Sequence, residues 1–241
     1  MHTGVTHTFN FLAPYVEEED SEMQELTQKQ AYLKERLEAA ATHLRLTHNI
    51  SIPNYTCSRN DRITGEKALG GTFILIENNM PHFPLPKPAL QHIEATILVL
   101  TPSNLNPTSI ISVYVLPSSD ERLFTLDFIH LLQTNINCVH FGDLNATHNE
   151  WNFSINSTHG KQLKTFADLL VLNIAYPDTP TGFGFTSPNT LDIAIINKFH
   201  FPYTIDSIPE ISSDHNSVFL NLSTPLFTVI ILEQLSPVGQ L

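Results

Sequence analysis

The chain has 241 residues, of which 41% are hydrophobic and 15% are charged, and its formal net charge is −12. This composition excludes a disordered or fibrous chain, and the length suffices to bury a sizeable core. The excess of acidic over basic side chains argues against tight nonspecific binding of nucleic acid, which needs Lys and Arg against the phosphates. An acidic site that holds a cation is compatible with this charge.

No targeting or membrane segment is predicted. Residues 1–10 lack the basic stretch and the long apolar run of a signal peptide. The apolar run at 226–232 is too short to span a bilayer. Cys57 and Cys138 form no recognisable pattern, which favours a reducing compartment. We therefore expect a soluble intracellular protein with no membrane partner.

The predicted elements begin with a helix and continue as strands. An acidic run at 17–20 precedes residues 21–24, which have the form of a capping box, and helix formers continue to Ala40. The pattern predicts a helix over about 22–41, exposed on one face. Beyond it, β-branched and apolar runs between Pro, Asn and Gly predict strands at 72–76, 92–100 and 109–115.

The second half of the chain alternates helices and strands. Residues 117–120 cap a predicted helix over about 121–133, and its expected apolar face consists of Leu123, Leu126, Phe128, Ile129 and Leu132. Strands are predicted at 136–141, 191–196 and 218–222, with a helix at 161–170. Residues 225–241 have no clear partner and are expected to form a tail. The succession favours an α/β fold of two stacked, mostly antiparallel sheets flanked by helices.

Three short polar segments adjoin predicted strands and carry carboxylates. Asp143 and Asn145 stand two residues apart where the strand at 136–141 ends, so both side chains can face one side. Asp192 lies within an apolar run, where a charge needs a partner or hydrogen bonds. Asp214 and His215 stand together just before the strand at 218–222.

Each segment alone also has a purely structural explanation. Gly-Asp-x-Asn at 142–145 favours a turn, Asp192 can be a strand-end residue, and an isolated Asp-His pair is more often a surface loop or a cap. Together, the segments supply what phosphodiester hydrolysis requires. Carboxylates hold a hard divalent cation with its waters and the substrate phosphate. An imidazole near a buried carboxylate can activate water.

In this order the segments resemble the endonuclease/exonuclease/phosphatase superfamily, which includes the apurinic endonucleases and DNase I. Within it, the sequence is most similar to the endonuclease domain of jockey-like non-LTR retrotransposons. The resemblance extends from residue 42 almost to residue 223. The segments that carry it are 42–44, 52–55, 59–62, 70–72, 113–114, 117–119, 142–146, 151–152, 180–181, 191–194 and 213–216.

The resemblance implies a four-layer α/β sandwich like that of DNase I. It also implies cleavage of one DNA strand with a divalent metal, leaving a 3′ hydroxyl that primes reverse transcription. His215 matches the family's catalytic histidine, and Asp192 matches the carboxylate paired with it. Asp143 matches the residue proposed to orient the attacking water.

The same resemblance assigns the phosphate side and the metal side of the site. Asn145 matches the amide that contacts and polarises the scissile phosphate, and Asp214 matches a metal-side ligand. Tyr114 matches the phosphate-contacting tyrosine, and it is equally well explained as an aromatic residue of a strand. The implied cofactor is Mg²⁺ or Mn²⁺, the implied partner is DNA, and the implied location is the nucleus.

The sequence departs from the family's pattern before residue 42. Ala41 occupies the position of the family's principal metal-binding Glu, and the helix-like residues 36–40 replace the apolar strand expected before it. Asn10 lacks the Trp-Asn-x-Asn-Gly context of the family's first strand. We therefore expect the first two strands to be lost or replaced. Metal binding should be weakened, because Mg²⁺ depends on one or two protein carboxylates.

These observations divide the chain into a divergent segment at 1–41, a nuclease-like domain at 42–224 and a tail at 225–241. Glu38 can replace the missing ligand only if the first helix ends close to the site. Three functions remain open at this point. They are a working endonuclease with metal held by Asp143 and Asp214, an impaired relic acting at most as a weak DNA-binding or interaction module, and a phosphatase or lipid phosphodiesterase. The Trp-Asn pair at 151–152 weighs against the third.

Overall fold

The computed structural model describes residues 52–64, 67–103, 105–116, 120, 123–153, 155–183, 188–199, 202–208, 217–223 and 228–232, together with Gln28. The chain divides into two compact units, Met1–His43 and Leu44–Leu241, and the strands and helices below belong to the second unit. The helix predicted at 22–41 lies outside the described residues except for Gln28, which is helical. The expected loss of the first two strands also falls on residues that are not described.

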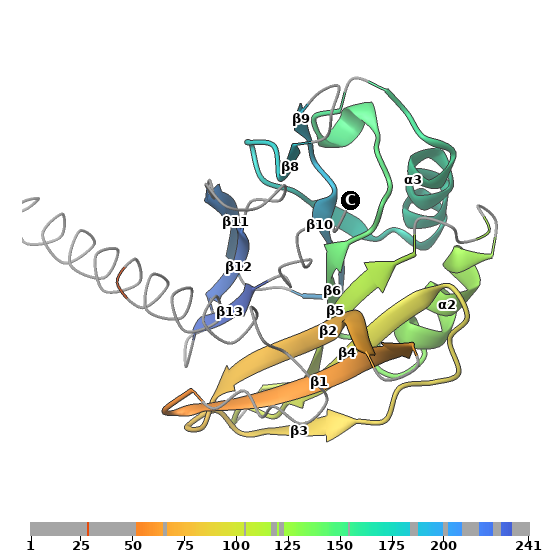
Figure 1. Cartoon of the computed structure of the whole chain (residues 1–241). Coiled ribbons are helices and arrows are strands. Elements are labelled where there is room, and N and C mark those ends of the chain that lie inside the picture. Colours follow the sequence, from red (N-terminus) through yellow and green to blue (C-terminus); the bar gives the residue numbers. More distant parts are fainter. Residues whose placement is uncertain are drawn as a thin grey trace, which may run out of the picture. The chain divides into compact units, whose positions relative to one another are not determined.

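A six-stranded sheet carries the site (Figure 1), and its strands lie in the order β3-β4-β5-β6-β10-β7. The bounds are β3 His82–Leu85, β4 Ile93–Leu100, β5 Thr108–Val115, β6 Cys138–Asp143, β10 Asp192–Asn197 and β7 Asn173–Ala175. The β5–β6 pair is parallel, because the chain crosses over between them through the helix α2 (Phe124–Leu132). The other neighbours in this sheet are antiparallel.

Further strands pack on one face of that sheet. They are the hairpin of β1 (Tyr55–Thr64) and β2 (Lys67–Glu77) and the sheet of β11 (Tyr203–Ile208), β12 (Ser217–Ser223) and β13 (Thr228–Leu232). Ile74 of β2 and Leu220 of β12 belong to the same buried apolar cluster as Leu98 of β4. The short strands β8 (Gly182–Phe183) and β9 (Pro188–Asn189) pair with each other.

Helices cover the opposite face of the six-stranded sheet. Phe128 of α2 and Leu163 of α3 (Thr158–Leu170) share a second buried cluster with Val113 of β5 and Ile193 of β10. Successive strand residues alternate between the two clusters, as the two-residue repeat of a strand requires. The described part of the chain is therefore two stacked, mostly antiparallel sheets with helices, which confirms the predicted fold class. No helix in these ranges is long and apolar enough to cross a membrane.

The predicted strands at 72–76, 92–100, 109–115, 136–141, 191–196 and 218–222 coincide with or overlap β2, β4, β5, β6, β10 and β12. The strand β1 was not predicted because its sequence, YTCSRNDRIT, contains no apolar run. The expectation of a tail at 225–241 is wrong for Thr228–Leu232, which form β13 against β12. An edge strand presents unpaired N–H and C=O groups, and β13 satisfies those of β12.

The apolar face predicted for α2 is confirmed at Phe128 and Leu132, which pack in or against the core, and is wrong at its other three positions. Leu123, Leu126 and Ile129 are 42%, 49% and 37% exposed, whereas Phe124 and Asp127 are buried together with Phe128 and Leu131. The cause is the carboxylate of Asp127, whose Oδ2 accepts hydrogen bonds from the backbone N–H groups of residues 91, 92 and 93 at 2.9, 2.6 and 3.0 Å. Because these bonds satisfy the charge, an acidic residue occupies the inner face.

Candidate active site

Four polar side chains lie in one row across the end of the six-stranded sheet. In the strand register, Asp192 of β10 is opposite Asp143 of β6, Asp143 is beside Tyr114 of β5, and Tyr114 is opposite Glu94 of β4. Residues paired in this way project from the same face of a sheet. Their chain neighbours, such as Val113 and Ile193, belong to the cluster under the helices. The row therefore lies on the face opposite the helices.

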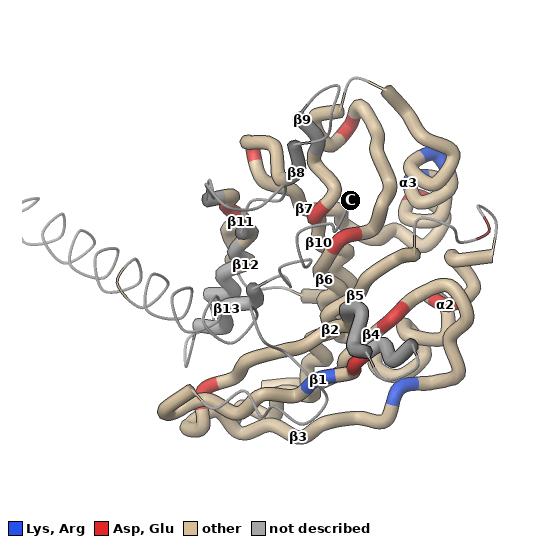
Figure 2. Tube along the Cα trace, viewed as in Figure 1, with Lys and Arg blue, Asp and Glu red and all other residues tan. Residues whose placement is uncertain are grey.

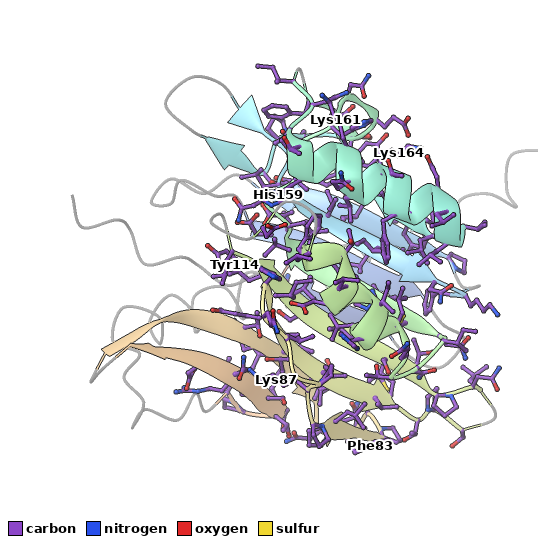
Figure 3. All side chains as sticks on the ribbon, turned by 90° about the vertical axis from the view of Figure 1, so that its right-hand side faces the viewer. Phe83, Lys87, Tyr114, His159, Lys161 and Lys164 are labelled. Carbon is purple, nitrogen blue, oxygen red and sulfur yellow. The ribbon has the colours of Figure 1, made fainter. Side chains whose placement is uncertain are left out.

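Three of the four residues in the row were predicted from the sequence, and Glu94 was missed. Tyr114 stands at the end of β5 (Figure 3), next to the carboxylates on both sides. Glu94 was missed because it was read as part of the apolar run at 92–100. A glutamate inside such a run is itself a signal, since a charge in a buried strand needs a partner.

The row contains three carboxylates, and the four strands that carry it contribute no basic side chain of Lys or Arg. Figure 2 shows acidic positions along these strands near their ends, and the basic positions lie elsewhere on the trace. An anion such as phosphate is repelled by such a row unless a cation accompanies it.

Asp143 and Asn145 form a closed turn where β6 ends. The backbone N–H of Asn145 donates to Oδ1 of Asp143 at 2.8 Å, and its side-chain amide donates to Oδ2 at 3.3 Å. The same amide donates to the backbone carbonyl of Val115 at 2.9 Å, which joins the turn to the end of β5. Asn145 has φ +45°, a left-handed conformation that Asn tolerates better than most residues. The turn expected from the Gly-Asp-x-Asn pattern and the polar site are thus the same structure.

Gly142 allows β5 and β6 to approach each other beside this turn. Its φ is +150°, and a Cβ atom there would lie 1.9 Å from the carbonyl oxygen of Val113. Only glycine fits a contact of this kind, because the obstacle is backbone and cannot rotate away. The residue before Asp143 is therefore fixed by the packing of the strands, and it sets how closely Asp143 and Tyr114 stand.

The loop that follows Asp143 is held at several points. The N–H of Leu144 donates to the carbonyl of Leu191 at 3.1 Å, directly before Asp192. Trp151 is buried, and its indole N–H donates to the carbonyl of Ala146 at 2.8 Å. Further along, the hydroxyl of Ser157 caps α3 through the N–H of Gly160 at 2.9 Å, and it also accepts the N–H of Thr147 at 3.0 Å. These hydrogen bonds fix the loop after Asp143 to the start of β10 and to α3.

Asp192 is the most deeply placed member of the row, with no exposed surface. Its backbone N–H donates to the hydroxyl oxygen of Thr181 at 3.2 Å, and the N–H of Leu191 donates to the same oxygen at 3.0 Å. Thr181 is itself fully buried. The sequence pointed to Thr181 only as part of the family resemblance, and no spacing rule predicts that its hydroxyl fixes the start of β10.

The remaining predicted residues, Asp214 and His215, lie in the segment 209–216, which the structure does not describe, as does Ala41 in the first unit. Among the described residues, no three His, Cys, Asp or Glu side chains gather closely enough to hold a metal ion. The described half of the site thus supplies oxygen atoms of the kind that a hard cation prefers but does not complete a metal centre by itself.

A buried histidine lies near the site but on the other face of β6. His140 has no exposed surface and meets Phe128 edge to face, with ring centroids 5.6 Å apart. Burial lowers the pKa of His140 to about 4, and the backbone of Ile195 opposes this shift. His140 is therefore neutral at physiological pH and packs as a core residue, separate from the row of carboxylates.

Comparisons with known proteins agree with this geometry. A family described as "Endonuclease-reverse transcriptase" matches residues 108–219, which include Tyr114, Asp143 and Asp192. The protein "Probable RNA-directed DNA polymerase from transposon X-element" of Drosophila melanogaster is 29% identical over 184 residues, which are 71% of this chain and 19% of that protein. The chain therefore spans about a fifth of the length of this relative.

The fold has a solved counterpart. The structure of the "Endonuclease domain of TRAS1, a telomere-specific non-LTR retrotransposon" superimposes with a TM-score of 0.61 and 15% sequence identity, covering 72% of this chain and 82% of that one. The shared sheets show the DNase I-like fold. The segment that the family model matches contains Tyr114, Asp143 and Asp192 of the row, but not Glu94, and it contains the turn after β6. The comparisons thus confirm the predicted resemblance to the endonuclease domains of retrotransposons within the endonuclease/exonuclease/phosphatase superfamily.

Proposed function

We propose that this domain hydrolyses a phosphodiester bond in one strand of DNA and that the resulting 3′ hydroxyl primes reverse transcription. The observation that carries the proposal is the row of Tyr114, Asp143 and Asp192 beside the closed turn of Asn145. The matched relative is named a probable RNA-directed DNA polymerase of a transposon, which supports a role in priming. For the same reason we place the action of the domain in the nucleus.

In this proposal each side chain has a separate task. Asp143, held by Asn145, orients the attacking water. The long 3.3 Å bond from the Asn145 amide to Asp143 is the bond that a phosphate oxygen can replace, while the bond to Val115 stays in place. The hydroxyl of Tyr114 donates a hydrogen bond to another phosphate oxygen. Asp192 pairs with His215 and raises its basicity, so that the imidazole takes the proton of the water.

The reaction also requires a divalent cation in this proposal, Mg²⁺ or Mn²⁺. The support is the three carboxylates of the row, which supply the oxygen ligands that a hard cation prefers. Asp143 and Asp214 would supply oxygen ligands to the cation, and Ala41 would supply none. The cation would neutralise charge on the phosphate and on the leaving oxygen. We expect its binding to be weak because a principal carboxylate of the family is missing.

Ala41 also favours a second function. With Ala41 at the metal-binding position and a net charge of −12, the chain can be a catalytically impaired relic that acts at most as a weak DNA-binding or interaction module. Basic side chains are few, since the chain has 12 Lys and Arg against 24 Asp and Glu. Lys161 on α3 and Lys87 after β3 lie on opposite sides of Tyr114 in Figure 3, and Lys87 already donates to Asn60 at 3.1 Å.

Nicking of a supercoiled plasmid with Mg²⁺ or Mn²⁺ separates the two functions. A working nuclease converts the plasmid to the open circular form, and His215→Ala abolishes the conversion. If the parent is inactive and Ala41→Glu nicks, the relic function holds. If His215→Ala nicks as fast as the parent, the assignment of the site is wrong. Thermal melting with and without the cation gives an independent reading, because a cation that binds the folded state raises its Tm.

A further inference from the structure

Large apolar side chains that are exposed gather on the outer side of the helix layer. Among the described residues, seven of the nine exposed large apolar side chains lie on α2 and α3 or close to their ends. Both helices lie on the same side of the six-stranded sheet (Figure 1). We call these seven side chains the outer apolar face. It consists of Leu123, Leu126, Ile129, Ile136 and residues 169–171.

The two parts of the outer apolar face come together because α2 and α3 run in the same direction. Each helix follows a strand that ends at the polar row, β5 before α2 and β6 before α3, and each precedes a strand that begins at the other end of the sheet. The rings of Phe128 and Phe166, with centroids 6.1 Å apart, show that the helices are neighbours. The C-terminal halves of both helices therefore lie at the end of the sheet that is away from the row. A partner that binds there leaves the candidate site open.

The helix α2 is apolar around its whole circumference. Its inner side packs into the buried cluster under the helices through Phe124 and Phe128. Its outer side carries a stripe of Leu123, Leu126 and Ile129, at the three-residue spacing that places helix residues on one face. The one carboxylate of α2 is buried and accepts backbone hydrogen bonds, so the outer side of the helix bears no charge. A surface helix has a polar outer side, and a helix that is apolar on all sides is normally covered on all sides.

Val171, at the end of α3, gives a second and independent indication that this face is covered. Its backbone is left-handed, with φ +54° and ψ +44°, a conformation that is costly for a β-branched residue and that normally selects Gly or Asn at a helix end. The side chain of Val171 is 89% exposed, so contacts inside the described part of the chain do little to offset this cost. A partner on the outer apolar face would contact the side chain that glycine lacks.

We propose that the outer apolar face binds the same face of a second copy of this chain. The lack of charge on α2 disfavours nucleic acid as the partner, because DNA is bound through Lys and Arg. Each copy has a net charge of −12, so two copies repel each other least where they meet through uncharged surface. At the α3 end, the nearest acid, Asp168, is already paired with Lys164. An apolar stripe is complementary to itself, as a two-fold contact between identical surfaces requires.

The size of the outer apolar face sets the expected strength of the dimer. A specific interface of standard size buries about 800 Å² on each partner. Seven partly exposed side chains supply a few hundred Å² of apolar surface. The contact therefore belongs to the small and reversible class of interfaces, and we expect a Kd of about 10 µM. Because the two copies repel each other through their net charge, salt should strengthen the dimer by screening that repulsion.

Sedimentation velocity of the whole chain tests the proposal, over concentrations from about tenfold below to about tenfold above the expected Kd. The weight-average mass of the parent should rise toward twice the monomer mass, and it should rise at lower concentration in high salt. Leu126→Glu places a charge in the middle of the stripe in both copies and should stay monomeric throughout. Ile155→Glu is the matched control, because Ile155 is 68% exposed outside the outer apolar face. It should associate as the parent does.

Val171→Gly supplies a second variant whose two readouts have opposite signs. Glycine relieves the left-handed backbone, so the Tm of the monomer should rise, and it removes an interface side chain, so the dimer should dissociate more readily. A parent that stays monomeric at every concentration and salt overturns the proposal. So does a Leu126→Glu or Val171→Gly protein that associates as tightly as the parent. These measurements need no cleavage of DNA, so their failure leaves the nuclease function untouched.

Discussion

Asp127→Ala removes one carboxylate oxygen that accepts three backbone N–H groups. Oδ2 of Asp127 receives the N–H groups of Gln91, His92 and Ile93, at distances between 2.6 and 3.0 Å. Asp127 is 4% exposed, and its helix α2 thereby fixes the entry into β4. Glu94 follows directly, so the bond set also determines where the first member of the polar row stands.

The expected loss of stability is large for a single side chain. A hydrogen bond to a charged group contributes about 1.5–3 kcal/mol, and a buried donor left without its partner costs about 1–3 kcal/mol. Because the three bonds share one oxygen and are not additive, we expect Asp127→Ala to lower the free energy of unfolding by about 3–5 kcal/mol. This is a substantial part of the ~5–15 kcal/mol that stabilises a typical domain.

Urea unfolding followed by far-UV circular dichroism measures the effect. Asp127→Asn keeps an oxygen in place without the charge and should cost about half as much, since charge-assisted bonds are about twice as strong as neutral ones. Asp168→Ala is the control, because Asp168 pairs on the surface with Lys164 at 2.6 Å and should change stability by less than about 0.5 kcal/mol. Equal losses for Asp127→Ala and Asp168→Ala would refute the structural role of Asp127.

Three further predictions concern the packing around the site. Gly142→Ala places a Cβ 1.9 Å from the Val113 carbonyl at φ +150°, so it should destabilise by about 3 kcal/mol or prevent folding, as urea unfolding will show. The pKa of His140 in the folded protein is about 4, below its ordinary value of 6.5. As the pH falls from 6.5 to 4, the free energy of unfolding should therefore fall by about 3 kcal/mol, at about 1.4 kcal/mol per pH unit. The pH dependence of Tm should flatten in His140→Leu. Trp151→Phe loses the bond to Ala146 and should cost about 1–2 kcal/mol, with faster hydrogen exchange in residues 144–151.

The strands with apolar runs were predictable from the sequence, and those with polar faces were not. β4, β5, β6 and β10 are buried on both faces, so their sequences are mostly apolar rather than alternating between apolar and polar residues. β1 has no such run, and β13 was taken as part of a tail because its pairing with β12 is set by tertiary contacts. The spacing of apolar residues also predicted part of the buried face of α2 wrongly, because the hydrogen bonds of Asp127 determine which side of the helix faces inward.

The candidate site was predictable where a carboxylate or amide side chain stands at the end of a strand that the sequence also predicts. Asp143, Asn145 and Asp192 stand at strand ends, and the structure brings Asp143 and Asp192 into one register. Glu94 and Thr181 were not predictable in their roles, because strand order and a side-chain bond to distant backbone create them. Asp214 and His215 lie outside the described residues and stay predictions.

The central claim is that the row at the end of the six-stranded sheet cleaves a phosphodiester bond. Its most direct test is the initial nicking rate of Asp192→Asn on supercoiled plasmid with Mn²⁺, compared with Asp168→Asn, a surface change of the same kind, and with the parent. We predict that Asp168→Asn matches the parent, that Asp192→Asn loses most of the rate with an unchanged melting curve, and that a polymerase extends the nicks left by the parent from a 3′ hydroxyl. Nicking by Asp192→Asn at the rate of the parent would contradict the claim.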